Sequence, residues 1–504
     1  MCKQQWFLLV ILWAMVSVVS QAQIQVYQTD IELNNLNIRG QPVTLAQIDL
    51  TADQSGSVYV RFDGYAILTP GDRVIVAASD EPDWNSFSGS VGLEAFDADG
   101  NRRPFSHSRV YQINPGDHTF YAVAENAVEE EGSGFASFFG RLTVKYYPNT
   151  GSGAFLFGQS IQLVNNTSSV VNDQFDFLAN PSDGTACFHF DANVIQGPGF
   201  FSFIELSNIP DDLESTSSVR VNSINNDINQ NPISISQAYD IQGDIFSAFR
   251  EIRTTLGDPG QVPTNTVMGN LVVEYLPPGT GFGFFIKEPV EVLQADVFNG
   301  PIVLGQIDMV APTAGKVLVT YDGLYTGSPL NRVIVGVNNQ MDLADGAGHT
   351  QLETPGMGGG TISFSHSGLF NVNPGAHSFY ALADVSEENS GQNPPFFYTN
   401  LIVQFIPDLS TSVEDPVVLT FFEGMTIAPN PSAGPIEFRF QGQLERSFDI
   451  EIYDVQGRIV RRAHIPSGID PNWQVDLSNE PAGLYYISLI DESGILTTPI
   501  SIQR

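Results

Sequence analysis

Short segments in which apolar and polar residues alternate recur along most of the chain. The segments VTLAQIDL (43–50), GSVYVRFDG (56–64) and HTFYAVAE (118–125) show this period of two, which is typical of strands with one buried face. Turn sequences such as DG, NPG and PG separate the segments. A helical period is nowhere sustained over three turns. The pattern predicts an all-β protein built from β-sandwich domains of jelly-roll type.

The same series of segments occurs three times. Residues 42–148 align with residues 301–407 at a constant offset, and a diverged copy lies between them. We therefore expect β-sandwich repeats at 23–150, 151–280 and 281–408, with a linker at 409–424 and a smaller β-sandwich at 425–504. The joints between repeats are short and rich in proline and glycine, which predicts a semi-rigid rod of domains.

The N-terminus has the features of a secretory signal peptide. Lys3 precedes an apolar run from Phe7 to Val19, and Ser20-Gln21-Ala22 places small residues at the −3 and −1 positions. We expect cleavage after Ala22, which makes residues 1–22 the signal peptide. The apolar run is shorter than the roughly 20 residues that a bilayer requires, and no later stretch qualifies, so no transmembrane segment is expected in the mature protein.

The last part of the chain carries a series of short motifs in a fixed order. These motif residues are Pro429, Asn430, Pro431, Tyr453, Asp454, Gly457, Arg458, Asp476, Leu477, Gly483 and Tyr485. With these motifs the segment 425–504 resembles the type A C-terminal sorting domain of the type IX secretion system of Bacteroidota. The domains of this family often end in a lysine-containing strand, whereas this chain ends in TTPISIQR.

The resemblance implies a route to the cell exterior. The signal peptide would direct export to the periplasm, and the type IX translocon would then recognise the folded C-terminal domain. In that family the domain is usually removed, and the cargo is released or attached to surface lipopolysaccharide. The translocon is thus the implied partner, and the location is either secreted or the outer cell surface.

Composition excludes several classes of partner. The chain has 21 Lys and Arg against 56 Asp and Glu, a formal net charge of −35, while 42% of its residues are hydrophobic. A nucleic-acid or anionic-membrane partner is excluded, because binding it requires many Lys and Arg side chains. Signal cleavage would leave Cys187 as the single cysteine, so no internal disulfide is expected. Cys187 lies in the strand-like run TACFHFD and is expected to be a small buried apolar residue.

Histidines and aspartates recur at matching positions. The histidines keep the same spacing in the first and third copies: His107 and His118, then His366 and His377. The middle copy has Ile235 and Ile245 at these positions, which favours buried, hydrogen-bonded imidazoles on neighbouring strands over a metal pair.

The recurring aspartates offer a second candidate site. The aspartates in the first and third copies are Asp49, Asp63, Asp308 and Asp322. Asp49 and Asp308 are predicted on the polar face of an outer strand, while Asp63 and Asp322 precede glycine and are expected to cap turns. The alternative is a Ca²⁺ site, the only cofactor that the sequence suggests, because Ca²⁺ prefers carboxylate oxygens.

Aromatic residues in predicted loops form the candidate binding site. These residues are Trp84, Phe87, Phe138, Phe139, Phe397 and Tyr398. Exposed aromatic rings can stack on sugars or form a protein-binding patch, although β-sandwich cores are also rich in phenylalanine and tyrosine.

Sequence motifs of common enzymes are missing, and no catalytic residue is assigned. The leading hypothesis is a non-enzymatic secreted or surface protein with an adhesive or structural role, which contacts glycans or surface proteins through its loop aromatics. The alternatives are a secreted polysaccharide hydrolase or lyase, whose paired carboxylates would be recognisable only in space, and a spacer in a surface filament.

Overall fold

The computed structural model consists of strands and their connections, and none of the described residues is helical. The description covers residues 23–502 apart from the following segments: 83–89, 96–100, 127–133, 150–153, 164–170, 178–183, 197–200, 208–217, 223–228, 242–245, 256–264, 277–282, 293–299, 329–331, 344–347, 355–359, 386–394, 409–425, 429–431, 433–434, 440–446, 455–457, 466–471, 482 and 492–493. The predicted all-β class is confirmed. Within the described part of the chain, no helix is long and apolar enough to cross a membrane.

Three stretches of the chain each contribute eight strands. The first contains β1 (Gln25–Asn37), β2 (Val43–Ala52), β3 (Gly56–Leu68), β4 (Arg73–Ser79), β5 (Val91–Glu94), β6 (Asn101–Ile113), β7 (Gly116–Asn126) and β8 (Phe135–Pro148). The second contains β9 (Phe155–Leu163), β10 (Val171–Phe177), β11 (Gly184–Gln196), β12 (Phe201–Ser207), β13 (Ser218–Asn222), β14 (Asn229–Ile241), β15 (Phe246–Thr255) and β16 (Asn265–Leu276). The third contains β17 (Phe284–Val292), β18 (Ile302–Ala311), β19 (Gly315–Gly327), β20 (Arg332–Asn338), β21 (Thr350–Glu353), β22 (Gly360–Val372), β23 (Gly375–Val385) and β24 (Phe396–Pro407).

Each stretch folds into two four-stranded antiparallel sheets with the same strand order. In the first repeat one sheet has the order β1-β8-β3-β6 and the other the order β2-β7-β4-β5. The second repeat has β9-β16-β11-β14 and β10-β15-β12-β13, and the third has β17-β24-β19-β22 and β18-β23-β20-β21. This order, in which the chain passes back and forth between two facing sheets, is that of a jelly roll. We call the sheet that contains β3, β11 or β19 the inner sheet and its companion the outer sheet.

The two kinds of sheet differ in how their strands are buried. Along β2 of an outer sheet, the apolar side chains Leu45, Ile48 and Leu50 point into the sandwich, and the polar residues between them are at the surface. Along β3 of an inner sheet nearly every residue is buried, including Arg61 and Asp63. A strand that is buried on both faces must pack against a second layer. For each inner sheet, this second layer comes from the other two repeats.

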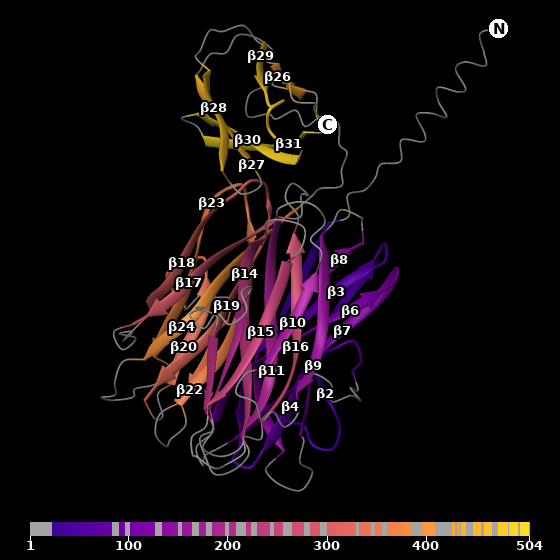
Figure 1. The fold of residues 1–504 in the computed structure, drawn as a ribbon, viewed down its shortest axis with the longest axis vertical. Helices are drawn as coiled ribbons and strands as arrows, with labels where there is room; N and C mark the ends of the chain where they lie inside the picture. Colours follow the sequence, from indigo (N-terminus) through magenta and orange to yellow (C-terminus); the bar gives the residue numbers. More distant parts are fainter. Residues whose placement is uncertain are drawn as a thin grey trace, which may run out of the picture.

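The three inner sheets face one another and form a single junction. Arg61 of β3 is 2.9 Å from Asp322 of β19, and it also approaches His189 of β11. An apolar cluster between the repeats includes side chains from all three: Tyr59, Tyr147, Cys187, Val272, Ile402 and Ile406. Figure 1 shows the strands of the three repeats side by side in one bundle. The predicted rod of domains is therefore wrong, because the short joints fold the repeats back onto one another.

The aspartates that were expected to cap turns lie in the middle of inner strands. Asp63 and Asp322 are fully buried, and the following Gly64 and Gly323 continue β3 and β19. Gly64 has a φ of 153°, and a Cβ atom there would lie 2.2 Å from the carbonyl oxygen of Phe139 on β8. The DG pair thus marks a close approach of two backbones and not a turn.

The C-terminal segment forms a smaller sandwich, drawn in yellow in Figure 1. Its strands are β25 (Thr426–Ala428), β26 (Pro435–Arg439), β27 (Phe448–Asp454), β28 (Ile459–Ile465), β29 (Asn472–Asp476), β30 (Gly483–Asp491) and β31 (Gly494–Ile502). They form sheets with the orders β25-β26-β29 and β28-β27-β30-β31. The core between the sheets contains Ile436, Phe438, Ile450, Ile452 and Ile487.

Candidate functional site

A group of polar side chains from all three repeats is buried where the inner sheets meet. Three of these residues occupy one position of the repeat: Lys145 on β8, Glu274 on β16 and Gln404 on β24. Lys145 donates hydrogen bonds to Glu274 and, at 3.1 Å, to the side-chain oxygen of Gln404. Tyr147 donates to the other oxygen of Glu274 and accepts from the Gln404 amide at 3.1 Å. The hydrogen-bonding groups of the Lys145 cation, the Glu274 anion and the Gln404 amide thus satisfy one another at one level of the junction.

The carboxylate of Glu274 is ionised despite its complete burial. Burial alone would raise its pKa, but Lys145 and the His189 ring, 3.0 Å away, outweigh this and lower the pKa to about 2. Burial lowers the pKa of His189, so the imidazole is neutral and donates to Glu274. The sequence contains a signal for this site: the aligned runs LTVKYYP, LVVEYLP and LIVQFIP differ in charge at one position of an otherwise apolar strand.

A second level of the junction holds one arginine among three equivalent aspartates. The Nη2 atom of Arg61 lies 2.9 Å from Asp322 and 4.0 Å from Asp191, and its Nε atom lies 3.8 Å from Asp63. All four side chains are at most 2% exposed. Burial raises the pKa of Asp63. For Asp191 burial acts in the same direction, but Arg61 and the hydroxyls of Ser108 and Ser234 outweigh it and lower the pKa.

Serines of one repeat donate hydrogen bonds to the buried aspartates of another repeat. Ser367 of the third repeat donates to Asp63 of the first, through its hydroxyl at 2.7 Å and its backbone N–H at 2.9 Å. Ser236 of the second repeat donates to Asp322 of the third. Between the first and second repeats the contact is made by Arg61, which donates to the hydroxyl of Ser234 at 3.3 Å. The three contacts follow one another around the junction, so each repeat is tied to both others.

Cys187, His189 and Glu274 lie close together in this junction, as a nucleophile, a base and an acid would. The Cys187 sulfur and the Glu274 carboxylate both approach Nε2 of His189, at 3.4 and 3.0 Å. A catalytic triad needs the two partners on different ring nitrogens, because one orients the base while the other accepts a proton. Burial also raises the pKa of the Cys187 thiol well above its usual value. The arrangement is therefore a packed polar core, and Cys187 is buried as the sequence predicted.

The repeated histidines do not form pairs. His107 and His366 are buried on inner strands β6 and β22, where His107 accepts a hydrogen bond from the backbone N–H of Ala78 at 2.9 Å. His118 and His377 lie on outer strands β7 and β23 and bond to nearby backbone carbonyls. The prediction of a pair on neighbouring strands is wrong, because the chain crosses from the inner to the outer sheet between them. Burial was predicted correctly for His107 and His366.

The four aspartates proposed as calcium ligands are divided between the two kinds of sheet. Asp49 and Asp308 are exposed on β2 and β18, where Thr119 and Ser378 donate to them at 2.8 and 2.6 Å. Asp63 and Asp322 belong to the buried junction. In the described ranges, no group of three or more His, Cys, Asp or Glu side chains is placed to hold a metal ion.

The six candidate aromatic residues have different environments. Trp84 and Phe87 lie outside the described residues. Phe138 and Phe397 are fully buried in β8 and β24, so the expectation of an exposed surface is wrong for them, because these positions point into the sandwich. Phe139 is partly buried and stacks on Tyr65, with ring centroids 5.0 Å apart. Tyr398 is 40% exposed.

The motif residues of the C-terminal domain make turns and core contacts. Asp454 accepts from the Arg458 backbone at 2.9 Å and from its guanidinium at 2.7 Å. Asp476 accepts from the backbone N–H of Ser478 at 2.8 Å, and Leu477 is fully buried. The remaining described members, Tyr453, Gly483 and Tyr485, belong to strands β27 and β30. Pro429, Asn430, Pro431 and Gly457, like the predicted cleavage site at Ala22, lie outside the described residues.

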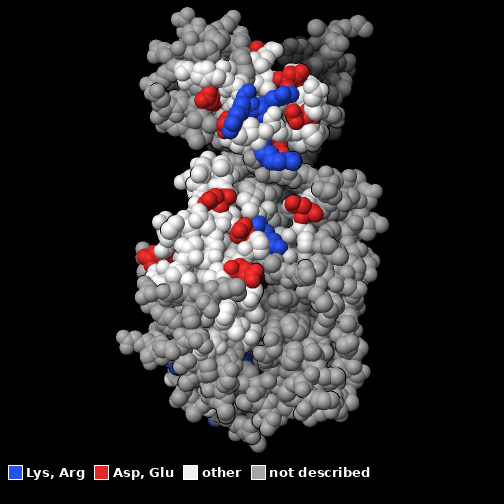
Figure 2. Space-filling view, turned by 60° about the vertical axis from the view of Figure 1, so that its left-hand side comes forward, with Lys and Arg blue, Asp and Glu red and all other residues white. Residues whose placement is uncertain are grey.

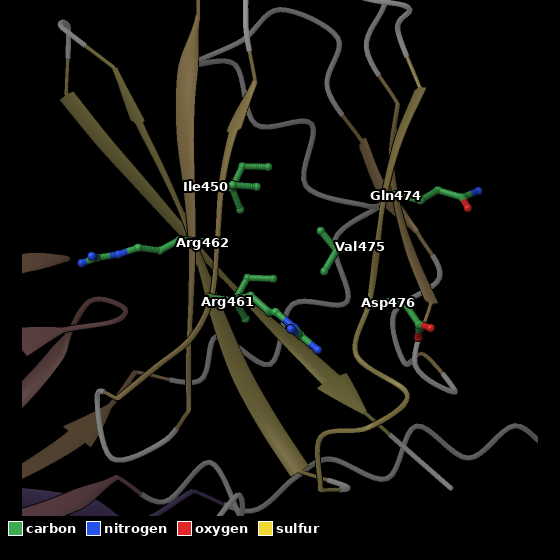
Figure 3. A pocket seen from close by; sticks show the side chains of 8 residues that line it. Ile450, Arg461, Arg462, Gln474, Val475 and Asp476 are labelled. Carbon is green, nitrogen blue, oxygen red and sulfur yellow. The ribbon is translucent and has the colours of Figure 1, made fainter.

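A pocket of about 260 Å³ opens between the two sheets of this domain, as seen in Figure 3. Its lining comes from three strands: Ile450 and Ile452 of β27, Arg461, Arg462 and Ala463 of β28, and Gln474, Val475 and Asp476 of β29. The inner part is apolar, while Arg461 and Asp476 bring opposite charges to its lining. The pocket can accommodate an apolar group with a polar neighbour.

Comparison with known families identifies the C-terminal segment. Residues 426–503 match the family model described as "Secretion system C-terminal sorting domain". The predicted sorting domain is confirmed for residues 426–503, and this match supports the predicted export by type IX secretion. The family of the three-repeat body is not assigned by this match.

Comparisons of the whole chain add nothing about the body. No curated protein matches the sequence. Similar solved structures include a β-glucuronidase from Ruminococcus gnavus, at 13% identity over 40% of this chain and 35% of the other, and one from Faecalibacterium prausnitzii, at 14% identity over 40% and 36%. Both have a TM-score of 0.13, and the chain spans about a third of their length. Likenesses at this level carry no argument about fold or function.

Proposed function

We propose that the three-repeat body is a non-enzymatic binding module that acts outside the cell, with a glycan or a surface protein as its ligand. The observation that supports this most is the buried junction of Lys145, Glu274 and Gln404. It uses the inner faces of the repeats for internal packing, whereas the outer strands β2 and β18 keep exposed polar positions along one face. Weak binding at equivalent surfaces would add up through avidity.

The alternative of a polysaccharide hydrolase or lyase requires carboxylates that a substrate can reach. Asp63, Asp191 and Asp322 are the carboxylates grouped around Arg61 in the junction, and each is at most 1% exposed. Each also accepts a hydrogen bond from a serine of its own or another repeat. This group therefore supports a packing role, and the adhesive hypothesis remains the proposal.

The route by which the protein reaches its site of action is part of the proposal. Removal of residues 1–22 after Ala22, passage through the periplasm, and loss of the sorting domain before about Met425 would follow the family pattern. Terminal peptides of the secreted protein, identified by mass spectrometry, test this. Retention of residues 425–504 in the medium would contradict removal of the domain.

Binding to a polysaccharide array tests the adhesive role. The full chain is applied with Ca²⁺ and with a chelator, beside the variants Trp84→Ala, Tyr398→Ala and Tyr27→Ala. Tyr27 is a matched control, since its side chain is 37% exposed but lies on the inner-sheet strand β1 and is not one of the candidate loop aromatics. We expect saturable binding that weakens in Trp84→Ala or Tyr398→Ala and not in Tyr27→Ala. A blank array in both conditions would contradict a glycan ligand, and loss of binding with chelator would support calcium at Asp49 or Asp308.

A further inference from the structure

Lys287 of β17 is a half-buried cation between the second and third repeats. The chain has four lysines, one of which lies in the predicted signal peptide. Lys145 pairs with Glu274, and Lys316 donates to the carbonyl oxygen of Val26 at 3.0 Å. No carboxylate of a described residue acts on Lys287, and burial lowers its pKa to about 8. A cation held partly out of water without such a counter-ion gains free energy when an anion binds to it.

The groups around Lys287 do not replace a counter-ion. Its ammonium lies 5.9 Å from the centre of the Tyr239 ring, at the outer range of a cation–π contact. Cys187 lies close enough to act on this charge, but burial raises the pKa of its thiol well above the usual value, so the thiol is neutral. Phe285 and Ala238, beside these residues in the chain, belong to the apolar cluster between the repeats.

The equivalent residue of the first repeat shows what Lys287 lacks. Gln28 of β1 and Lys287 of β17 lie opposite Thr143 and Ile402, which share one position of the repeat. The side-chain oxygen of Gln28 accepts a hydrogen bond from the backbone N–H of Leu369 at 3.0 Å, across the junction of the first and third repeats. An ammonium group has no acceptor atom, so Lys287 cannot accept such a bond.

The backbone group that corresponds to Leu369 is the N–H of Ala238. Ala238 of β14 has the position in the second repeat that Leu369 has in the third, as the pairing with β11 and β19 shows. The N–H of Ser234, four residues earlier on the same edge strand, donates to Ser363 of the third repeat at 2.9 Å. Because successive N–H groups of a strand point to opposite sides, the N–H of Ala238 points toward the third repeat as well. Lys287 and this N–H are therefore two donors on facing strands.

Charge and the number of donors indicate which anion fits. Two donors match the two oxygens of a carboxylate, whereas a phosphate has further oxygens that these donors would leave unpaired. The net charge of −35 opposes each additional negative charge on a ligand. Figure 2 shows that the charged side chains on this face of the described body are mainly Asp and Glu. A group with a single negative charge is therefore favoured.

We propose that Lys287 and the backbone N–H of Ala238 form a binding site for a small monocarboxylate at the junction of the second and third repeats. The ammonium donates to one carboxylate oxygen and the N–H to the other, with the Tyr239 ring beside them. The bound carboxylate joins β14 to β17 and strengthens the contact between these two repeats. The site does not depend on the ligand proposed for the body.

The first test measures the reactivity of each lysine in the full chain. The chain is acetylated with an N-hydroxysuccinimide ester in sodium acetate or in sodium chloride of equal ionic strength, and its peptides are analysed by mass spectrometry. A bound carboxylate keeps the proton on Lys287, so saturation with acetate should slow acetylation of Lys287 by about fivefold or more and leave that of Lys316 unchanged. Equal rates for Lys287 in the two salts, or equal slowing at Lys316, would overturn the proposal.

Variants separate the site from general effects of charge and salt. Acetate should cause a saturable rise in the Tm of the unmodified chain and of Lys316→Gln, which loses the same charge at another junction. Lys287→Gln should keep the fold, because glutamine is the residue at the equivalent position, Gln28, and it should lose the rise. A rise that persists in Lys287→Gln, or that phosphate produces equally, would overturn the proposal. A blank polysaccharide array would leave all these outcomes unchanged.

Discussion

Lys145 of β8 and Glu274 of β16 occupy the same position in two repeats and form a buried ion pair where the three inner sheets meet. The third equivalent residue is Gln404, which accepts a further hydrogen bond from Lys145. If the three repeats were identical in sequence, the same charged residue would occupy this position three times. The three like charges would then repel one another in a medium of low dielectric constant. The arrangement is possible because the three repeats belong to one chain and have diverged at this position.

Breaking the ion pair should destabilise the body strongly. Glu274→Gln leaves Lys145 buried without its counter-ion, and Lys145→Gln leaves Glu274 in the same state, so each should lower the free energy of unfolding by about 3–5 kcal/mol. The double variant places glutamine at all three equivalent positions and should recover much of this loss. Urea unfolding of the full chain measures all three.

The exposed pair of Arg462 and Glu451 is the control for this cycle. Its side chains are 67% and 17% exposed, so Glu451→Gln should change the free energy of unfolding by about 0–1 kcal/mol. A similarly small effect for Glu274→Gln would show that the junction does not hold the repeats together.

Acid should weaken the fold in two stages. Burial and the neighbouring Arg141 lower the pKa of His366 well below its usual 6.5. As the pH falls below 6.5, the His366 imidazole therefore stays neutral in the folded state, whereas it gains a proton in the unfolded state. The free energy of unfolding then has its full value above pH 6.5. Below pH 6.5 it falls by up to about 1.4 kcal/mol per pH unit for one histidine. Glu274, with its pKa lowered to about 2, adds a second loss between pH 4.5 and pH 2.

His366→Gln tests the first stage. The variant should show a shallower decline of unfolding free energy between pH 6.5 and pH 5, whatever its stability at neutral pH. An unchanged slope would mean that His366 is protonated in the folded protein.

Gly64 should not tolerate a side chain. Ala at this position would meet the Phe139 carbonyl at 2.2 Å and keep a φ of 153°, so Gly64→Ala should cost roughly 3 kcal/mol or more. Gly116 has a φ of 133° but no atom within 4 Å of a Cβ, so Gly116→Ala reports the backbone strain alone, about 1–3 kcal/mol. Thermal unfolding of both variants compares them, and equal losses would contradict the close approach of β3 and β8.

Cys187 should be unreactive in the folded chain. Its side chain is fully buried, and burial raises the pKa of the thiol well above 9.0, so almost no thiolate is present at neutral pH. A thiol reagent such as 5,5′-dithiobis(2-nitrobenzoic acid) should label it only after denaturant is added. Rapid labelling without denaturant would place Cys187 in an accessible site.

The sequence predicted features that depend on local pattern. Alternation along residues 43–50 indicated a strand with one buried face, and β2 has that pattern of burial. The motifs around Asp454 and Asp476 identified the sorting domain, because they form turns within a few residues of themselves. The burial of Cys187 followed from the apolar character of its own strand.

Predictions that required a spatial partner were the ones that failed. Asp63 before Gly64 has the local signature of a turn, but its partners are Arg61 and a serine more than 300 residues away, Ser367. Phe138 has the flanking residues of a loop, yet it lies in the core.

The sequence alone determined that this protein consists of β-sandwiches and carries an export domain, because both follow from the period of the strands and from short motifs. The tertiary structure decided that the repeats meet face to face and not end to end. That choice depends on the complementarity of Lys145, Glu274 and Gln404, which lie in three separate repeats. A buried charge is stable only where its counter-ion is within contact distance, and contact across repeats is a property of the folded chain and not of its local pattern.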